Sequence, residues 1–228
     1  MKLTEKDKSI LIGLLLGDGY INDKGRIEIE HCEKQKDYCI FKAKLLHSVC
    51  GGKDIKVHEY IRNRSILKDK KQFKESTFIT YSFKKQSQSF IPIRTMLYGE
   101  DRKKRITKEI LDLLTPEAIA LWWMDDGCLT KKYTYVDGEK KHCGYMLRIC
   151  TYLSKEQNEL IRQYFIDKYD MIWNVVKADG AKDDTQWMLR CGSIEGRKFL
   201  NIIREYIEKN VPSMNYKVIN IWHECSTS

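Results

Sequence analysis

Two short segments of this chain are apolar on every side, and each ends in an acidic residue followed by glycine. They span residues 11–19 and 119–127. A helix that is apolar all round has to be buried, and a carboxylate at its end needs a partner, a metal ion or a cleft. The pattern therefore predicts two related halves that meet along two buried helices, with Asp18 and Asp126 at the seam.

The elements predicted after each motif follow the same order. Hydrophobic periodicity and turn residues predict for the first half a hairpin turn at 20–25, strands at 26–31, 55–62 and 77–83, and helices at 35–49 and 86–97. They predict for the second half a turn at 136–139, strands at 145–152, 172–178 and 185–191, and helices at 155–169 and 193–209. Each half therefore follows the order αββαββα, and we divide the chain into residues 1–114 and 115–228.

The strands alternate polar and apolar residues, which predicts antiparallel sheets that helices cover on one face only. In the strand at 26–31, Arg26, Glu28 and Glu30 share one side, whereas Ile27 and Ile29 point to the core. The expected fold class is α+β, with two pseudo-symmetric halves. A two-stranded ribbon fits the major groove of DNA, so the two open sheet faces would form a saddle for a duplex.

The net charge of +9 favours a polyanionic partner, of which nucleic acid is the commonest. Lysine and arginine concentrate in residues 62–74 and 102–108, and recur at Lys131, Lys132, Lys140 and Lys141. A solvated basic surface is the alternative interpretation of the charge. The apolar fraction of 42% is enough for a packed core, and with only three prolines we expect the halves to be joined rigidly.

The eight cysteines form no C-x-x-C pair and no spacing typical of zinc, which favours a reducing, intracellular compartment. The first eight residues are too charged for a signal peptide, and the apolar run at 10–16 is too short to span a membrane. The sequence does not distinguish an organelle, a phage or a bacterium as the origin.

Both motifs resemble the signature helices of the LAGLIDADG homing endonucleases, in the single-chain, two-motif branch that includes intron-encoded mitochondrial enzymes. The first motif carries the signature residues Leu11, Gly13, Leu14, Asp18 and Gly19. The second carries Ala120, Asp126 and Gly127, but Leu121 replaces a small residue. The resemblance implies that the two motif helices form the interface between the halves. Because Leu121 and Asp125 are larger than their counterparts, we expect this packing to be asymmetric.

The resemblance also implies that the two acids bind divalent metal beside the scissile phosphates, with Mg²⁺ as the cofactor and Mn²⁺ as a substitute. The ligands would be the carboxylates of Asp18 and Asp126 and the carbonyls of the preceding residues, Gly17 and Asp125. Only one of two adjacent helical side chains is expected to point into the seam. Alignment with Asp18 selects Asp126 rather than Asp125.

Two lysines, one late in each half, resemble the catalytic lysines of the family. Lys104 follows Asp18 in the first half, and Lys217 follows Asp126 in the second. A cation at these places would stabilise charge on the phosphate or polarise the attacking water. Lys103 is the alternative to Lys104, and either lysine could instead be a simple phosphate contact.

The polar strand faces and loops supply the candidates for reading the DNA sequence, since Arg and Lys suit guanine and Glu accepts from cytosine. The candidates are Arg26, Glu28, Glu30, Lys56, His58, Tyr60, Arg62, Arg64, Thr80, Ser82, Lys84, Arg148, Cys150, Lys177, Gln186 and Arg190. Each could instead be a solvated strand residue. We expect residues 62–74 to form a basic loop that grips phosphate, and the five histidines to be structural or to contact DNA.

The expected function is that of a site-specific endonuclease that cuts both strands of a long DNA target, acting as a monomer in intron homing. The resemblance implies short 3′ overhangs. One alternative is an intron RNA maturase on the same fold, with intron RNA as a partner. Another is a sequence-specific DNA-binding protein without catalysis. Neither alternative needs both acids and both lysines, which favours the nuclease.

Overall fold

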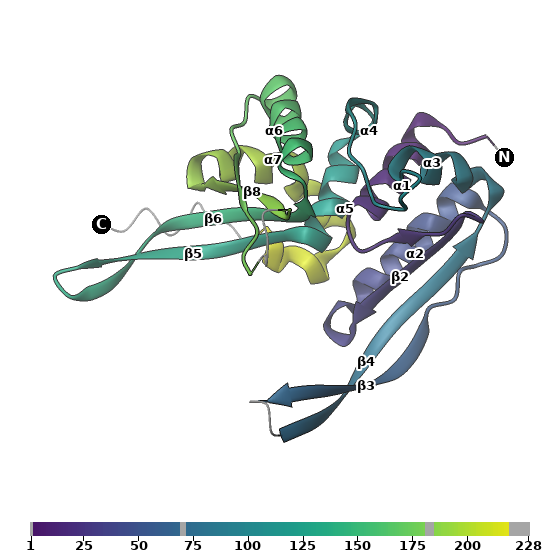
Figure 1. Ribbon diagram of the computed structural model, residues 1–228, viewed down its shortest axis with the longest axis horizontal. Coiled ribbons are helices and arrows are strands. Elements are labelled where there is room, and N and C mark those ends of the chain that lie inside the picture. Colours follow the sequence, from purple (N-terminus) through teal and green to yellow (C-terminus); the bar gives the residue numbers. More distant parts are fainter. Residues whose placement is uncertain (1, 69–71, 181–184, 219–228) are drawn as a thin grey trace.

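The computed structural model describes residues 2–68, 72–180 and 185–218, and of residues 64–68 and 72–76 it describes the backbone alone. Two halves lie side by side, each a four-stranded antiparallel sheet with helices packed on it (Figure 1). The first half contains α1 (Glu5–Leu16), β1 (Tyr20–Ile21), β2 (Arg26–Cys32), α2 (Lys36–Cys50), β3 (His58–Lys68), β4 (Gln72–Gln86), α3 (Ile91–Leu97) and α4 (Lys108–Asp112). The second half contains α5 (Pro116–Asp126), β5 (Gly127–Val136), β6 (Glu139–Leu153), α6 (Lys155–Tyr169), β7 (Asn174–Lys177), β8 (Trp187–Gly192) and α7 (Ser193–Asn210). Short 3₁₀ turns lie at Glu33–Gln35, Gln88–Phe90 and Pro212–Lys217.

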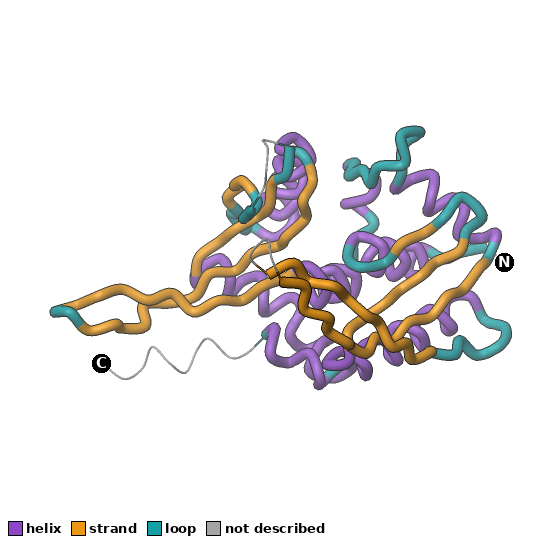
Figure 2. The backbone as a smooth tube through the Cα atoms, turned by 60° about the horizontal axis from the view of Figure 1, so that its bottom comes forward, coloured by secondary structure: helices purple, strands orange, loops and turns teal. Residues whose placement is uncertain are grey.

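The two sheets have the same topology. Their strand orders are β1-β2-β4-β3 and β5-β6-β8-β7, and every pair is antiparallel. The predicted α+β class with two pseudo-symmetric halves is therefore confirmed. The halves differ in which hairpin is long. In Figure 1 the ribbon of β3 and β4 extends from the first half, and the ribbon of β5 and β6 extends from the second, beyond the helices; Figure 2 shows the β5–β6 ribbon from another side.

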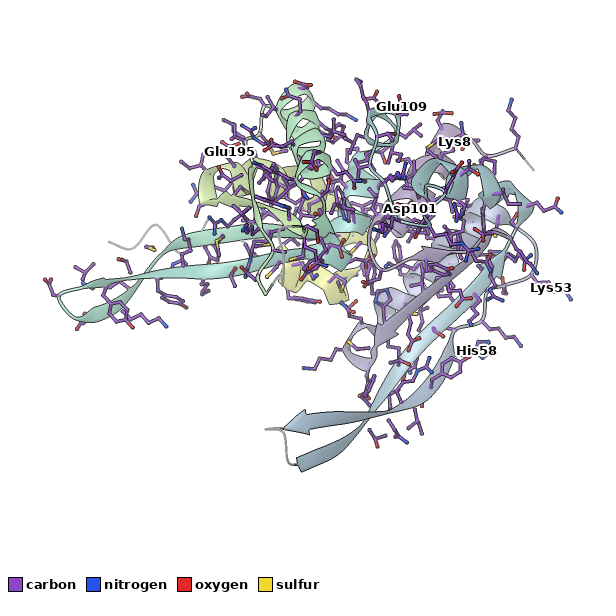
Figure 3. The ribbon with its side chains drawn as sticks, in the orientation of Figure 1. Lys8, Lys53, His58, Asp101, Glu109 and Glu195 are labelled. Atoms are coloured by element: carbon purple, nitrogen blue, oxygen red, sulfur yellow. The ribbon has the colours of Figure 1, made fainter. Side chains whose placement is uncertain are left out.

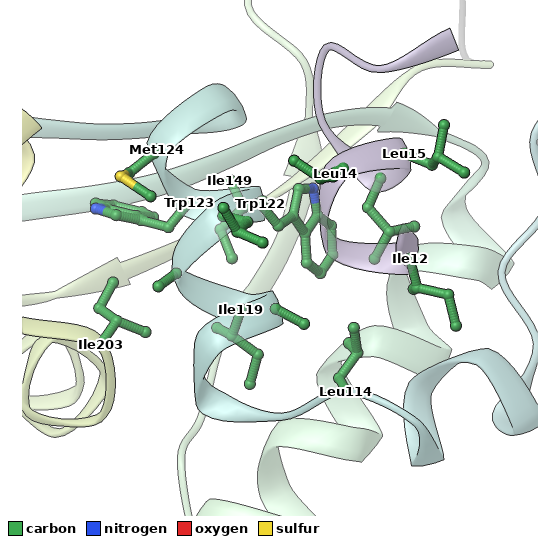
Figure 4. Close-up of a cluster of buried hydrophobic side chains, with 14 of the residues drawn as sticks. Ile12, Leu14, Leu15, Leu114, Ile119, Trp122, Trp123, Met124, Ile149 and Ile203 are labelled. Atoms are coloured by element: carbon green, nitrogen blue, oxygen red, sulfur yellow. The ribbon is translucent and has the colours of Figure 1, made fainter. Parts of the chain in front are cut away.

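The motif helices α1 and α5 pack against each other between the halves, as expected from their all-round apolarity (Figure 1). Residues 9–16 of α1 and 118–124 of α5 are buried. Thr4 caps α1 in a capping box with Asp7, and Thr115 caps α5. Figure 4 shows apolar side chains that the two helices bring together, among them Leu14, Ile119 and Trp122.

A close backbone approach explains one glycine of the first motif. A Cβ on Gly13 would lie 2.6 Å from the carbonyl oxygen of Ala118 on the facing helix. Only glycine lets the two backbones come this near without one of them moving. At the start of α5, the hydroxyl of its cap residue Thr115 lies 3.0 Å from the hydroxyl of Ser9 on α1, and the two share a hydrogen bond.

The open sheet faces follow the predicted alternation. In β2 the even-numbered residues Arg26 and Glu30 are exposed, whereas Ile27 and Ile29 are buried against the helices. In the second sheet Arg148 lies opposite Arg190, and the neighbouring pair Ile149 and Leu189 is buried. Each half therefore presents one polar face that the helices leave uncovered.

Two predicted elements were wrong. The segment 62–74 is not a loop, because β3 continues to Lys68 and β4 starts at Gln72. The part of this ribbon beyond the helices has no core to face, so its strands carry no apolar alternation that a sequence pattern could detect. The helix expected over 86–97 begins only at Ile91 after a 3₁₀ turn, with Pro92 in its first turn, a position where proline's fixed φ suits a helix start.

No helix among the described residues is long and apolar enough to cross a membrane. The cysteines of the described part of the chain are free thiols.

Candidate active site

The acids of the two motifs lie together at the seam, Asp126 as the last residue of α5 and Asp18 two residues beyond the end of α1. The side chain of Asp18 is 47% exposed and opens into a cleft of about 670 Å³ that the open face of the first sheet also lines. Asp126 is half-buried, and its carboxylate accepts a hydrogen bond of 3.1 Å from the indole N–H of Trp122, one turn earlier on α5. Both acids therefore lie at the interface between the halves, where the sequence predicted them.

Burial, reinforced by neighbouring negative charge, raises the pKa of both acids at the seam. Burial raises the pKa of Asp126 to about 7, and the nearby carboxylates of Asp125 and Asp18 act in the same direction. Burial and the Asp125 carboxylate also raise the pKa of Asp18, against the opposing effect of nearby lysines. Carboxylates that repel each other in this way favour binding of a proton or a cation between them.

Lys104 and Lys217 occupy equivalent places in the two halves. The ammonium of Lys104 donates to the carbonyls of Leu16 and Gly17, each at 3.2 Å. The ammonium of Lys217 donates to the carbonyls of Asp125 at 3.1 Å and Gly127 at 2.8 Å. Each lysine therefore reaches the carbonyl of the residue that precedes the acid of its own half. Burial lowers the pKa of both ammonium groups, and the acids at the seam oppose this.

The segments that carry these lysines are anchored. Lys104 forms an isolated bridge with Tyr98 after α3. The carbonyl of Lys217 accepts the indole N–H of Trp123 at 3.0 Å. Lys103, the alternative to Lys104, is exposed; its backbone N–H donates to the carboxylate of Asp101, and its carbonyl accepts the N–H of Gly99. Lys104 is thus the lysine that the fold aims at the seam.

The expectation that Asp125 points out of the seam was wrong. Its side chain is fully buried and crosses to the first half, where it accepts 2.6 and 2.7 Å hydrogen bonds from the ammonium of Lys42. It also accepts the backbone N–H of Asp18 at 3.0 Å. A Cβ on Gly17 would overlap this carboxylate, so the glycine makes room for it. Asp125 and Asp126 are adjacent in the last turn of α5. Because the helix ends there, their side chains point in different directions and both lie at the seam.

Three residues of α2 and β2 surround this carboxylate and were not predicted as site residues from the sequence. They are Lys42, Tyr38 and His31. Lys42 stands over the ring of Tyr38 at 4.3 Å, whose hydroxyl donates to the carbonyl of Leu121. The His31 ring nitrogen Nδ1 is 3.6 Å from Asp18 and 3.2 Å from Gln35, and burial lowers the pKa of His31 to about 4. A signal existed for Lys42, since it falls in the apolar stripe of its helix beside Cys39, Ala43 and Leu46.

The donors at the seam fit a hard divalent cation. The carboxylates of Asp18 and Asp126 and the carbonyls of Gly17 and Asp125 are the oxygen ligands that Mg²⁺ prefers. Each of these carbonyl oxygens has a second lone pair beside the one that its lysine uses. His31 also brings a nitrogen to within 4.8 Å of Asp18 and Asp125 oxygens. We do not count the Asp125 carboxylate as a ligand, because Lys42 occupies both of its oxygens.

The predicted DNA contacts of the first half share one open surface. Glu28 pairs with Arg26 at 2.7 Å and with Lys84 at 3.2 Å, and Glu30 pairs with Arg62 at 2.9 Å. Tyr60 lines the same cleft, and Lys56 and His58 line the hollow beside it (Figure 3 labels His58). Thr80 and Ser82 are also on this face but only 6% exposed. The side chain of Arg64 lies outside the described residues.

The predicted contacts of the second half are less uniform. Arg148 and Arg190 pair across β6 and β8 on the open face, with Cys150 two residues further along β6. Arg148 is held by an ion pair with Asp179. Gln186 is exposed before β8. Lys177 is exposed at the end of β7, where it pairs with Trp187, and it alternates to the side of the strand that carries Val175 rather than to the side of Asn174, which is opposite Arg190.

Comparison with known proteins decides the family. The family model of the LAGLIDADG DNA endonuclease family matches residues 8–199. The chain belongs to this family. A solved structure, the homing endonuclease I-WcaI bound to its DNA recognition sequence, superposes with a TM-score of 0.70 at 19% identity, covering 96% of this chain and 88% of that one. The LAGLIDADG fold therefore extends over nearly the whole chain.

Two of the curated relatives are about twice as long as this chain. Protein RecA of Mycolicibacterium flavescens is 24% identical over 225 residues, which cover 96% of this chain and 47% of the relative. The cytochrome b mRNA maturase bI2 of Saccharomyces cerevisiae is 28% identical over 217 residues, which cover 93% of this chain and 47% of the relative. The chain thus spans about half the length of the curated relatives it matches.

Proposed function

We propose that this LAGLIDADG protein is a site-specific DNA endonuclease that uses divalent metal, with Mg²⁺ as the natural ion, to hydrolyse one phosphodiester on each strand of a duplex. The observation that carries the proposal is the pair of equivalent sites at the seam. Each site has the acid of one motif and a lysine whose ammonium donates to the carbonyl of the residue before that acid. Two such sites related by a pseudo-dyad match the two strands of a duplex, so one chain suffices and we infer a monomer.

The seam supports hydrolysis through its own residues in three ways. Asp18 and Asp126 would hold the metal, which supplies charge neutralisation and an activated water when bound. The ammonium groups of Lys104 and Lys217 keep further N–H donors beyond their carbonyl contacts, and these can donate to a phosphate oxygen as its charge develops. The buried floor formed by α1 and α5 excludes bulk water from one side of the reaction.

The open sheet faces would bind the target. The net charge of +9 attracts the phosphate backbone, and the ribbons β3–β4 and β5–β6 have the width that the major groove admits. The ion pairs of Glu28 and Glu30 with Arg26, Lys84 and Arg62 orient these side chains for base edges. In family members of this type the product has short 3′ overhangs, and we propose the same product here.

The second candidate function is that of an RNA maturase. It is favoured by the 28% identity with maturase bI2 over 93% of this chain. Splicing assistance would use the basic surface and would not require the acids or lysines of the seam. Because Asp18, Asp126, Lys104 and Lys217 all converge on the seam, we place the nuclease first.

The test is cleavage of a randomised plasmid library. With Mg²⁺, a small set of sequences should be linearised, and sequencing of the ends should show cuts on both strands offset by a few nucleotides. With Ca²⁺ or EDTA in place of Mg²⁺ no linear product should appear. Retention of specific library members without cutting in Mg²⁺ would instead indicate a DNA-binding protein. Selective capture of intron RNA with no DNA selection would indicate the maturase.

Metal binding should depend on pH through Asp126. Its pKa in the folded protein is about 7, against an ordinary value of 3.8. The proton therefore favours the folded state at low pH, and this contribution is lost as pH rises through about 7. A cation has to displace that proton, so we expect Ca²⁺ or Mg²⁺ to raise the melting temperature more at pH 8 than at pH 5.5. Asp126→Asn should remove most of this difference. Equal shifts at both pH values in the wild type would contradict the assignment of Asp126 as a ligand.

A further inference from the structure

The pseudo-symmetry of the two halves is broken at one buried place. Asp125 and Gly17 each stand directly before the acid of their motif. Lys42 and Ile161 are each the seventh residue of a fifteen-residue helix, α2 in the first half and α6 in the second. Both are fully buried. A lysine and a carboxylate thus stand on one side of the pseudo-dyad where an isoleucine and a glycine stand on the other.

Packing alone does not account for the charged pair. The side chains of Lys42 and Asp125 are both 0% exposed, and removing two charges from water is costly. Apolar replacements of a buried ion pair are often neutral or stabilising. The isoleucine and glycine at the equivalent place show that this fold accepts such a solution. The charged pair therefore has a role that is not needed at the equivalent place of Ile161 and Gly17.

The ends of the two motif helices show what that role is. Helix α5 continues to Asp126, so the backbone of this acid is held by its own helix, and the N–H of the following Gly127 still bonds to the carbonyl of Trp123. Helix α1 ends at Leu16, and Gly17 leaves the helical conformation before Asp18 is reached. The N–H of the following Gly19 still bonds to the carbonyl of Leu14 on α1, but the N–H of Asp18 itself is bound from the other half, because it donates to the carboxylate of Asp125.

Lys42 completes this arrangement. Its ammonium contacts both oxygens of Asp125 at 2.6 and 2.7 Å and fixes the carboxylate in one orientation. It also supplies a positive charge among the carboxylates of Asp18, Asp125 and Asp126. Lys42 itself is held over the ring of Tyr38. Side chains that orient a catalytic ligand in this way typically change activity by about 10- to 100-fold when removed.

We propose that Asp125 and Lys42 are a positioning pair that holds the backbone of Asp18, and thereby sets the rate at which the DNA strand served by Asp18 is cut. The inference rests on the proposed nuclease function. It assigns the pair no contact with DNA or metal through its side chains. It makes the two sites unequal, since the site of Asp126 is held by its own helix.

The test replaces the charged pair by the two residues that stand at the equivalent places, isoleucine and glycine. The double variant Asp125→Gly with Lys42→Ile removes the carboxylate and its cation together and leaves the backbone carbonyl of residue 125 in place. A second double variant, Asp125→Asn with Lys42→Met, removes both charges but keeps an oxygen that can accept the N–H of Asp18. Each strand of a cleaved target is end-labelled separately, and Asp18→Asn identifies the strand that Asp18 serves.

We expect the Gly/Ile double variant to cut the Asp18 strand at least about tenfold more slowly, and the other strand within about threefold of the wild type. The Asn/Met double variant should recover most of the lost rate on the Asp18 strand. Binding of DNA in Ca²⁺ should stay the same in both. Equal slowing of the two strands, or no slowing of either, would overturn the proposal.

A measurement that needs no cleavage separates this inference from the proposed function. The amide proton of Asp18 should exchange with solvent slowly in the wild type, faster in the Gly/Ile variant and slowly again in the Asn/Met variant. If the wild type cuts no DNA but this exchange pattern holds, the nuclease proposal fails and the positioning contact stands. If exchange at Asp18 is the same in all three proteins, the positioning pair is refuted whatever the activity.

Discussion

Replacing either Asp18 or Asp126 by asparagine is expected to lower the rate of double-strand cleavage by about 10³-fold. Asparagine keeps the size of the side chain but has no negative charge to hold a divalent cation. The neighbouring carbonyls remain in place, so the loss would report the carboxylate itself. Initial rates of linear product from a plasmid with one target site measure the effect.

Two controls accompany these variants. Glu109→Gln removes one negative charge on the exposed surface of α4 (Figure 3), and it should cut at the rate of the wild type. DNA affinity measured in Ca²⁺ should be similar in all four proteins, because phosphate contacts along the sheets supply most of the binding. Full cleavage by Asp18→Asn or by Asp126→Asn would remove that residue from the metal site.

The single variant Lys42→Met is expected to lower the free energy of unfolding by about 3–5 kcal/mol. Methionine fills nearly the same volume, but it leaves the carboxylate of Asp125 buried without a cation. The carboxylates of Asp18 and Asp126 lie close by, and their repulsion adds to the loss. Denaturation by urea at pH 7.5 without metal measures the difference.

The matched control for this variant is Lys44→Met, two residues further along the same helix. Lys44 is exposed, so its replacement should change the stability by no more than about 0.5 kcal/mol. The double variant Asp125→Gly with Lys42→Ile should regain most of the stability that Lys42→Met loses, since no unpaired charge remains. If Lys42→Met is as stable as Lys44→Met, the ion pair does not have the buried geometry described above.

The amino-acid sequence by itself determined the architecture and the position of the two acids. Segments 11–19 and 119–127 are apolar on all sides, and no surface position can accommodate such helices, so they had to be buried against each other. Alternation in β2 defined its core and open faces, because one face of that strand packs on helices. Thr4, Thr115 and Ser154 capped their helices as local chemistry requires. These features depend on neighbours in the chain, which a sequence displays directly.

Only the tertiary structure decided which side chains contact one another at the seam. The direction of the Asp125 side chain depends on where α5 ends, on the space above Gly17 and on Lys42, which lies 83 residues away. Which of Lys103 and Lys104 reaches the seam depends on a bridge between Tyr98 and Lys104. The length of β3 and β4 was hidden because a ribbon that extends beyond the helices has no core to pack on and needs no apolar pattern. Local patterns record burial and backbone preference, whereas contacts between distant residues are set by packing, and the chemistry of this protein is built from such contacts.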